Sequence, residues 1–209
     1  MKKKSFKNWK LYVITDPKTA QRRSLTETVR EAVEGGASVV QLRNKKASDA
    51  ELISCAKDLL KITKPKRVPL IINDRIMVAK LSGADGVHLG QEDASFEEAR
   101  TILGKKAIIG RSTHSQTQAI EAQEEGFDYI GVGPVFKTPT KPKVRPVGLK
   151  LVEFAAKNIR IPFVAIGGID EGNVKQVARS GAKTVAVVRA VMQSEDPRRS
   201  VKNILKKIG

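Results

Sequence analysis

The stretch Gly83-Ala-Asp-Gly-Val-His-Leu-Gly-Gln-Glu-Asp93 places a glycine before a short apolar run that ends in polar residues. The same phrase, a glycine and an alanine or phenylalanine followed by an apolar run, recurs at Gly36, Gly126 and Gly181. Glycine commonly ends a helix, and short apolar runs rich in β-branched residues are typical of buried parallel strands. The phrase therefore marks the point where a helix ends and the chain enters the next strand.

Strand-like runs and amphipathic segments alternate along the whole chain. The expected strands are residues 11–16, 38–44, 69–74, 86–90, 107–113, 129–135, 162–169 and 184–190. The expected helices are residues 25–34, 49–62, 75–81, 96–103, 116–124, 149–156, 171–179 and 197–208. About eight such units in about 200 residues predict a single-domain α/β protein, a closed (β/α)₈ TIM barrel over residues 1–209.

Small polar residues that cap helix N-termini precede most of the expected helices. These residues are Ser24, Ser48, Ser95, Ser115, Asp170 and Asp196. A doubly wound open sheet is the alternative architecture, but it usually has fewer units and an early glycine-rich turn. The turn after the first strand reads Pro17-Lys-Thr-Ala-Gln-Arg22 and contains no glycine, which favours the barrel.

The formal net charge of +17 is too large to be explained by an anionic substrate alone. It predicts a solvated basic surface with weak, nonspecific affinity for nucleic acid at low salt. Because only 4% of the residues are aromatic, we expect no specific nucleic-acid function. No apolar run approaches the roughly 20 residues of a membrane helix, so we expect a cytoplasmic protein without membrane association. The sequence leaves a homo-oligomer open.

Polar residues follow the expected strands, and the carboxyl ends of barrel strands form the active site. Asp74 and Asp93 end neighbouring strands, and two carboxylates at one mouth suit Mg²⁺, which leaves its other positions to water and phosphate. Strand alternation directs Gln41, Arg43 and Lys45 to the same mouth, where the two cations would bind an oligophosphate. Each acid has a simpler explanation as a helix cap.

Further phosphate-binding and polar groups follow the later strands. The glycine pair Gly167-Gly168 and a helix start after the eighth strand resemble the usual phosphate site of a barrel. We therefore expect two anion sites, one around Arg43 and Lys45 and one around Gly168 and Arg189. His88 is expected to be a hydrogen-bonded histidine and not a metal ligand, and no nucleophile–base pair is expected at the rim.

Taken together, these strand ends resemble thiamine phosphate synthase over essentially the whole chain. The resemblance is carried by Gln41-x-Arg43-x-Lys45, Asn73-Asp74, Gly90-Gln-Glu-Asp93, Ser112 with His114, Gly133-Pro134, Thr138-x-Thr140-Lys141 and Gly167-Gly168-Ile169. It implies a transferase of thiamine biosynthesis that joins a hydroxymethylpyrimidine diphosphate to a thiazole phosphate. The products are thiamine phosphate and pyrophosphate.

The resemblance also implies a role for each matching residue. Asp74 and Asp93 would hold Mg²⁺. The pyrimidine diphosphate would be bound by Gln41, Arg43, Lys45, Asn73, Ser112 and Lys141. The thiazole phosphate would be bound by Thr138, Thr140, Gly168, Val188 and Arg189. Arg43, Lys45 and Lys141 would be the catalytic cations, because a dissociative reaction needs neutralisation of the charge that builds on the departing pyrophosphate. Arg189 departs from the family pattern, in which a serine is expected.

Two other functions remain as alternatives. A thiazole tautomerase of the related family would use His114 as an acid–base catalyst and would not need both acidic residues, so Asp74 with Asp93 favours the synthase. A basic nucleic-acid-binding barrel with a degenerate site would have lost rim residues, and this sequence retains them.

Overall fold

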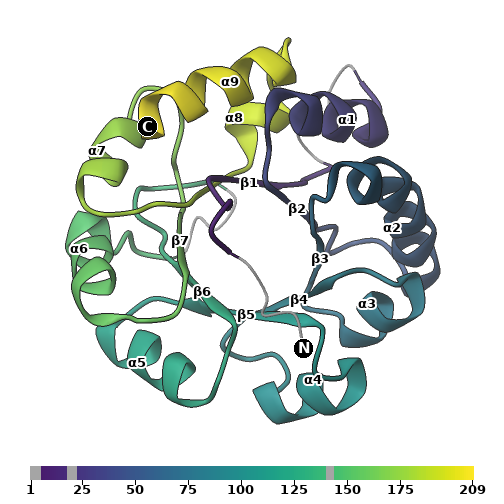
Figure 1. Cartoon of the computed structure of the whole chain (residues 1–209), viewed down its shortest axis with the longest axis horizontal. Coiled ribbons are helices and arrows are strands. Elements are labelled where there is room, and N and C mark those ends of the chain that lie inside the picture. Colours follow the sequence, from purple (N-terminus) through teal and green to yellow (C-terminus); the bar gives the residue numbers. More distant parts are fainter. Residues whose placement is uncertain (1–5, 18–22, 140–143) are drawn as a thin grey trace.

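The computed structural model describes residues 6–17, 23–139 and 144–209. Its strands form a closed barrel in the order β1 to β8, and every neighbouring pair, including β1 with β8, is parallel. Figure 1 shows the helices as an outer ring around these strands. The predicted single-domain TIM barrel is confirmed.

The elements have the following bounds. The strands are β1 (Leu11–Ile14), β2 (Val39–Leu42), β3 (Leu70–Asn73), β4 (Gly86–Leu89), β5 (Ile108–Thr113), β6 (Tyr129–Val132), β7 (Phe163–Ile166) and β8 (Val185–Val187). The helices are α1 (Leu25–Gly35), α2 (Asp49–Thr63), the short 3₁₀ helix η1 (Lys64–Lys66), α3 (Ile76–Ser82), α4 (Phe96–Leu103), α5 (Gln116–Glu124), α6 (Gly148–Asn158), α7 (Val174–Arg179), α8 (Arg189–Met192) and α9 (Pro197–Ile208). None of the described helices is long and apolar enough to cross a membrane.

Most of the predicted helix caps are confirmed. Ser24 and Ser48 each form a capping box, and Ser95, Ser115 and Asp196 each accept a backbone hydrogen bond from the first turn of the helix that follows. The prediction that Asp170 begins α7 is wrong. Its carboxylate instead accepts hydrogen bonds from the backbone nitrogens of Gly172 and Asn173, which form a turn before the helix. An aspartate serves such a turn as readily as a cap, so the residue type alone does not distinguish them.

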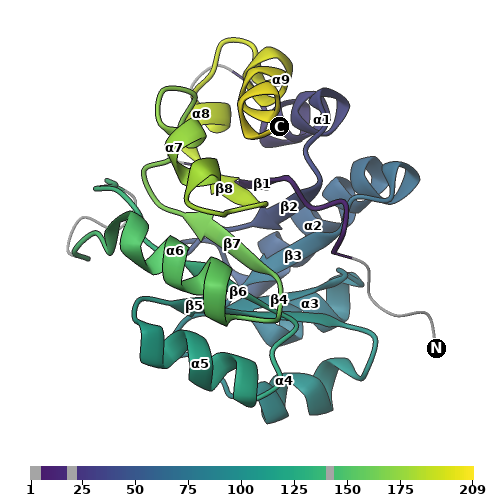
Figure 2. The same ribbon diagram turned by 60° about the vertical axis from the view of Figure 1, so that its left-hand side comes forward.

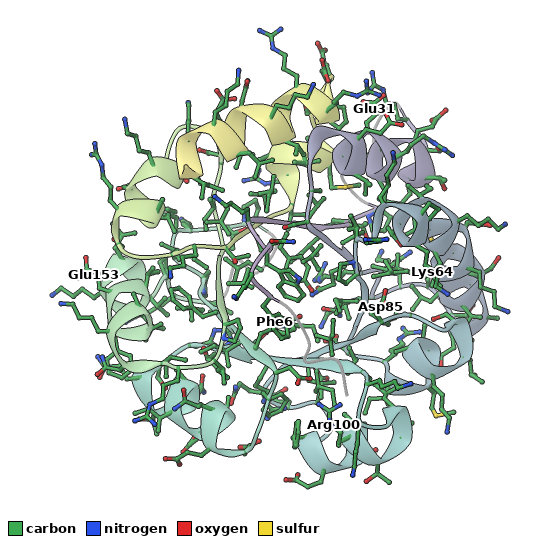
Figure 3. All side chains as sticks on the ribbon, viewed as in Figure 1. Phe6, Glu31, Lys64, Asp85, Arg100 and Glu153 are labelled. Carbon is green, nitrogen blue, oxygen red and sulfur yellow. The ribbon has the colours of Figure 1, made fainter. Side chains whose placement is uncertain are left out.

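The interior is divided into two apolar regions by the strand alternation. Outward-facing residues such as Val13 and Val40 pack beneath the helices, whereas Tyr12, Val39 and Tyr129 fill the barrel. Phe6 and Trp9 belong to the inner region, and Figure 3 places Phe6 within the ring of strands. The Trp9 ring lies 4.7 Å from the Phe6 ring and 5.1 Å from the Tyr129 ring, measured between centroids. The segment before β1 therefore contributes to the barrel core.

The first and last helices, α1 and α9, meet on one side of the barrel. Figures 1 and 2 both show α1 beside α9, and the approach is close at Gly35. A Cβ atom added to this glycine would lie 2.8 Å from the carbonyl oxygen of Arg198. Beneath this contact, the Thr184 hydroxyl donates to the carbonyl oxygen of Trp9 at 2.8 Å. Barrel closure is thus supported by both the strands and the helices.

Replacing Thr63 with valine is expected to stabilise the protein. Thr63 is fully buried. Among the described residues, its hydroxyl is the one buried side-chain polar atom that has no hydrogen-bond partner. Valine fills nearly the same space without the cost of burying this hydroxyl, so the free energy of unfolding should rise by about 1 kcal/mol. Urea denaturation measures the change. Thr113→Val is the control, because its buried hydroxyl donates to Gly131 at 3.0 Å; this variant should lose stability. A Thr63→Val protein as destabilised as Thr113→Val would contradict this account.

Candidate functional site

A cavity of about 340 Å³ opens at the carboxyl ends of the strands, and its size suits a small-molecule ligand. It contains most of the site residues predicted from the sequence, which otherwise lie far apart in the chain. The predicted residues that line it are Gln41, Arg43, Asn73, Ser112, Thr138, Gly168, Val188 and Arg189. Thr140 and Lys141 lie outside the described residues.

The two predicted metal-binding acids are neighbours in the structure. Asp74 follows β3 in the left-handed region, with φ of 63°, and its backbone nitrogen donates to the carbonyl oxygen of His88 at 2.9 Å. This conformation is uncommon outside glycine, although aspartate tolerates it better than most residues. Asp93 follows β4, and its carboxylate accepts a hydrogen bond from the backbone nitrogen of Gly90 at 2.5 Å. The turn at Asp74 leaves its carboxyl group close enough to Asp93 to affect the pKa of that group.

The electrostatics of this pair favour a bound cation. Burial raises the pKa of the Asp93 carboxyl group above its ordinary value, and the nearby Asp74 carboxylate raises it further. Lys45 offsets part of this repulsion, since its Nζ lies 3.2 Å from Asp74 Oδ2. Two like charges in contact resist ionising together unless a positive charge lies between or beside them. The pair therefore suits a divalent cation.

The donor set fits Mg²⁺ better than a metal that requires several protein ligands. Among the described residues, no group of three or more His, Cys, Asp or Glu side chains is arranged to hold a metal ion. Mg²⁺ commonly uses one or two carboxylates and completes its shell with water and substrate phosphate. Asp74 and Asp93 could supply these two carboxylates.

The basic residues after β2 occupy different positions. Arg43 lines the cavity with its Nη1 3.9 Å from Asp16 Oδ2, and the Thr15 hydroxyl accepts a hydrogen bond from the Arg43 backbone nitrogen at 3.0 Å. The Lys45 side chain is 60% exposed and lies beside Asp74, outside the residues that line the cavity. Arg43 is thus held at the mouth, whereas Lys45 stays at the rim with the acidic pair.

The loop after β7 requires glycine at two successive positions. Gly167 and Gly168 have φ angles of 104° and 65°. A Cβ atom at Gly168 would lie 2.7 Å from the carbonyl oxygen of Lys137, and one at Gly167 would lie 2.4 Å from Cβ of Pro134. The two loops are joined by a hydrogen bond from the Phe136 nitrogen to the Gly167 oxygen at 2.9 Å. This close packing positions Gly168 and Thr138 on the same cavity.

The sequence did not predict a hydrogen-bonded chain that crosses the floor of the cavity. The amide nitrogen of Gln41 donates to the Tyr12 hydroxyl at 2.8 Å, and the hydroxyls of Tyr12 and Tyr129 are 3.0 Å apart. His88 Nδ1 lies 2.9 Å from the Tyr129 hydroxyl, and His88 Nε2 lies 2.9 Å from Ser112 Oγ. We call Gln41, Tyr12, Tyr129, His88 and Ser112 the floor chain. As predicted, His88 is hydrogen-bonded, and its contact with Ser112 is a hydroxyl–imidazole pair that the sequence did not indicate.

The signal for the floor chain was present in two glycines. A Cβ atom on Gly110 of β5 would lie 2.2 Å from Cζ of Tyr129, and one on Gly131 of β6 would lie 3.3 Å from Cε1 of His88. Glycine inside a strand weakens it unless another group needs the space. Gly110 and Gly131 therefore mark the places where the Tyr129 and His88 rings enter the barrel.

His114 also lines the cavity, but it is held differently. Its Nδ1 is hydrogen-bonded to the carbonyl oxygen of Gly133, and its backbone nitrogen donates to Gln118 Oε1 at 2.7 Å. A carbonyl oxygen only accepts, so the proton of this contact resides on His114 Nδ1. In the neutral ring, Nε2 is then the acceptor.

Comparisons with known proteins agree with one another. The family model for thiamine monophosphate synthase matches residues 11–191. A thiamine-phosphate synthase from Dictyoglomus thermophilum is 42% identical over 202 residues, which cover 96% of this chain and 91% of that protein. One from Syntrophomonas wolfei is 45% identical over 190 residues, 90% of this chain and 91% of that protein.

Solved structures show the same relationship. A thiamine phosphate pyrophosphorylase from Pyrococcus furiosus superposes with a TM-score of 0.89 and 39% identity, and the match covers 96% of each chain. A 3-hexulose-6-phosphate synthase superposes with a TM-score of 0.70 at 19% identity over 96% of this chain and 100% of that chain. At that identity the second match supports the barrel fold alone.

Proposed function

Because this chain belongs to the thiamine-phosphate synthase family and is therefore a transferase, we propose that it joins a hydroxymethylpyrimidine diphosphate to a thiazole phosphate and releases pyrophosphate. The observation that carries this proposal is the closeness of Asp74 and Asp93, with Lys45 beside Asp74. These three residues do not line the ligand-sized cavity, but Asp74 directly follows Asn73, which does. This arrangement suits a substrate that brings a diphosphate and a divalent cation together.

Asp74 and Asp93 are the residues that would hold Mg²⁺. When bound, the ion would supply electrostatic stabilisation of the charge that develops on a leaving pyrophosphate. Arg43 adds a guanidinium group that binds phosphate oxygens in pairs, and Lys45 adds a mobile point charge at the rim. We include Lys141 in this role from the sequence pattern.

We propose that the pyrimidine occupies the cavity near Gln41, Asn73 and Ser112, and that the thiazole phosphate lies near Gly168 and Arg189. Loss of pyrophosphate would leave a carbocation on the exocyclic carbon of the electron-rich pyrimidine, and the thiazole nitrogen would then form the new bond. The chain's own residues bind and orient the two substrates and exclude water from the carbocation. Proximity of two substrates in one cavity is itself a large contribution to rate.

The direct test supplies the chain with both substrates and Mg²⁺ and measures thiamine phosphate and pyrophosphate together. We expect equal amounts of the two products, no turnover in EDTA and recovery when Mg²⁺ is restored. Undiminished turnover in EDTA, after residual metal is shown to be absent, would contradict the metal site. Absence of thiamine phosphate with an intact, metal-loaded protein would contradict the reaction.

Replacing Arg189 with alanine should weaken binding of the thiazole phosphate specifically. Arg189 begins α8 and lines the cavity, so we propose that its guanidinium group binds this phosphate. Loss of a charge-assisted hydrogen bond costs about 1.5–3 kcal/mol, which corresponds to a KM increase of roughly 10- to 150-fold. Steady-state kinetics with each substrate varied in turn measures the effect.

Arg179→Ala is the matched control, because it removes the same charge from an exposed position at the end of α7. It should leave both KM values close to those of the unmodified enzyme. Equal weakening of both substrates in Arg189→Ala would show that Arg189 supports the whole cavity and does not bind the thiazole phosphate selectively.

A further inference from the structure

The middle of the floor chain is buried and keeps its protons. Tyr12 and Tyr129 are almost fully buried, and burial raises the pKa of both hydroxyls well above the ordinary value for tyrosine. Each hydroxyl therefore carries one proton to donate, and each can also accept hydrogen bonds. Because a single proton serves each contact, the donor at one end of the chain determines the donor at every later contact.

The direction of the hydrogen bonds in the floor chain follows from its first contact, between Gln41 and Tyr12. The amide nitrogen of Gln41 donates to the Tyr12 oxygen, so the proton of Tyr12 is directed to the oxygen of Tyr129. Tyr129 then donates its own proton, and among its described contacts the available acceptor is His88 Nδ1. The His88 ring is consequently neutral with its proton on Nε2, which it donates to Ser112 Oγ.

The two ends of the floor chain face the cavity, one as a hydrogen-bond donor and the other as an acceptor. Ser112 accepts from His88, so its hydroxyl proton remains for a ligand in the cavity that it lines. Gln41 uses its amide nitrogen for Tyr12, so its carbonyl oxygen remains as an acceptor. The cavity thus presents a donor at Ser112 and an acceptor at Gln41. In this direction, His88 does not act as a base toward Ser112, because its Nε2 already carries a proton.

We propose that Tyr12, Tyr129 and His88 are positioning residues that fix Ser112 as a donor and Gln41 as an acceptor, and that they thereby select an aminopyrimidine over its deaminated, oxo counterpart. This inference rests on the proposed function for the identity of the ligand. An aminopyrimidine offers ring nitrogens that accept and an exocyclic amino group that donates. Deamination replaces this donor with a carbonyl oxygen and places a proton on an adjacent ring nitrogen.

Reversing the direction of the hydrogen bonds in the floor chain is costly, and this cost makes the site selective. To match the oxo compound, the Gln41 amide would have to turn over and every hydrogen bond from Tyr12 to Ser112 would have to change direction. The Tyr129 ring is held between Trp9, with centroids 5.1 Å apart, and the space left by Gly110. A site built to hydrogen-bond one ligand rejects an analogue that leaves its buried polar groups unpaired.

The first experiment measures the two imidazole tautomers in the ligand-free protein by ¹⁵N NMR at mildly alkaline pH. The chain has two histidines, which provide an internal comparison. We expect His88 with its proton on Nε2 and His114 with its proton on Nδ1. Tyr129→Phe keeps the ring and removes the donor to His88, so the His88 signals should shift toward a mixture of tautomers while those of His114 stay the same. A proton on Nδ1 of His88 in the unmodified protein would overturn the proposal.

The second experiment measures Mg²⁺-dependent binding of the aminopyrimidine diphosphate and of its oxo counterpart by calorimetry, without the thiazole. The unmodified protein should prefer the amino compound by at least about a hundredfold. Tyr129→Phe should reduce this preference at least tenfold. Tyr12→Phe interrupts the floor chain one contact earlier and should have the same effect, so it serves as the second variant if Tyr129→Phe folds poorly. Thr113→Val removes a buried hydroxyl outside the floor chain and should keep the preference.

The two experiments separate this proposal from the proposed function. An unchanged preference in both tyrosine variants would overturn the selective role of the floor chain, even if the protein makes thiamine phosphate. Failure of the unmodified protein to bind either pyrimidine diphosphate would contradict the proposed function and with it the selection of the pyrimidine. The tautomer of His88 would still test the direction of the chain.

Discussion

Asp93→Asn should lower the rate of thiamine phosphate formation by at least about a hundredfold, on the scale of losing one contact made to the transition state. Asparagine preserves the size of the side chain and its ability to accept the hydrogen bond from Gly90. It removes the negative charge that, with Asp74, would hold the divalent cation. Single-turnover kinetics at saturating substrate and several Mg²⁺ concentrations would measure the loss, which excess Mg²⁺ should recover only in part.

His114→Ala is the comparison that distinguishes synthase from tautomerase chemistry. The proposed carbocation is captured by the thiazole nitrogen without an imidazole, so this variant should keep substantial activity. A nearly silent Asp93→Asn together with an inactive His114→Ala would contradict the proposed reaction. That pattern would favour proton transfer through His114, as in a thiazole tautomerase.

Gly110→Ala is expected to cause a large loss of stability, about 3 kcal/mol or more, because a well-packed core does not absorb an added methyl group. The new Cβ atom would lie 2.2 Å from Cζ of Tyr129 and 2.6 Å from its hydroxyl oxygen. Tyr129 is fully buried and lies between rings on the floor of the barrel, so its ring has little room to retreat. Chemical denaturation would measure the change.

Two controls identify the overlap as the cause. Gly172→Ala makes the same substitution at an exposed turn, where the nearest atom would be Asp170 Oδ1 at 3.3 Å, and it should change stability by less than about 1 kcal/mol. In a Tyr129→Leu background the overlapping ring atoms are gone, so adding Gly110→Ala should cost little more. A full additional loss there would show that the strand backbone, not the ring, excludes the methyl group.

The sequence was sufficient to predict the barrel because its information is local and repeated. Each serine cap and each glycine stop acts within a few residues, and the repeat extends to the eight units that close a sheet. The prediction for Asp170 failed because a turn residue and a cap residue are chemically alike. The short helix α8 follows β8 without a cap bond from a side chain, so only its place in the barrel indicated a helix start.

The site was predictable where one residue acts alone at a strand end. Asp74 and Asp93 follow the adjacent strands β3 and β4, so their proximity follows from strand order. The floor chain joins residues from β1, β2, β4, β5 and β6 across the interior, and strand order does not indicate which inward-facing side chains meet there. Tyr12 and Tyr129 resemble ordinary core aromatics until the space at Gly110 is recognised.

The pairing of β1 with β8 has a consequence for synthesis of the chain. Leu11 lies opposite Val185, and the Lys10 carbonyl oxygen accepts from the Val185 nitrogen at 3.0 Å, so the first strand obtains its second neighbour only from near the end of the chain. While the chain is still on the ribosome, one edge of β1 has no strand to pair with. Unpaired strand edges recruit other chains, and domains emerge from their N-terminus first. Emergence of β8 from the ribosome, together with the docking of α9 on α1, is therefore the step that closes this exposed edge.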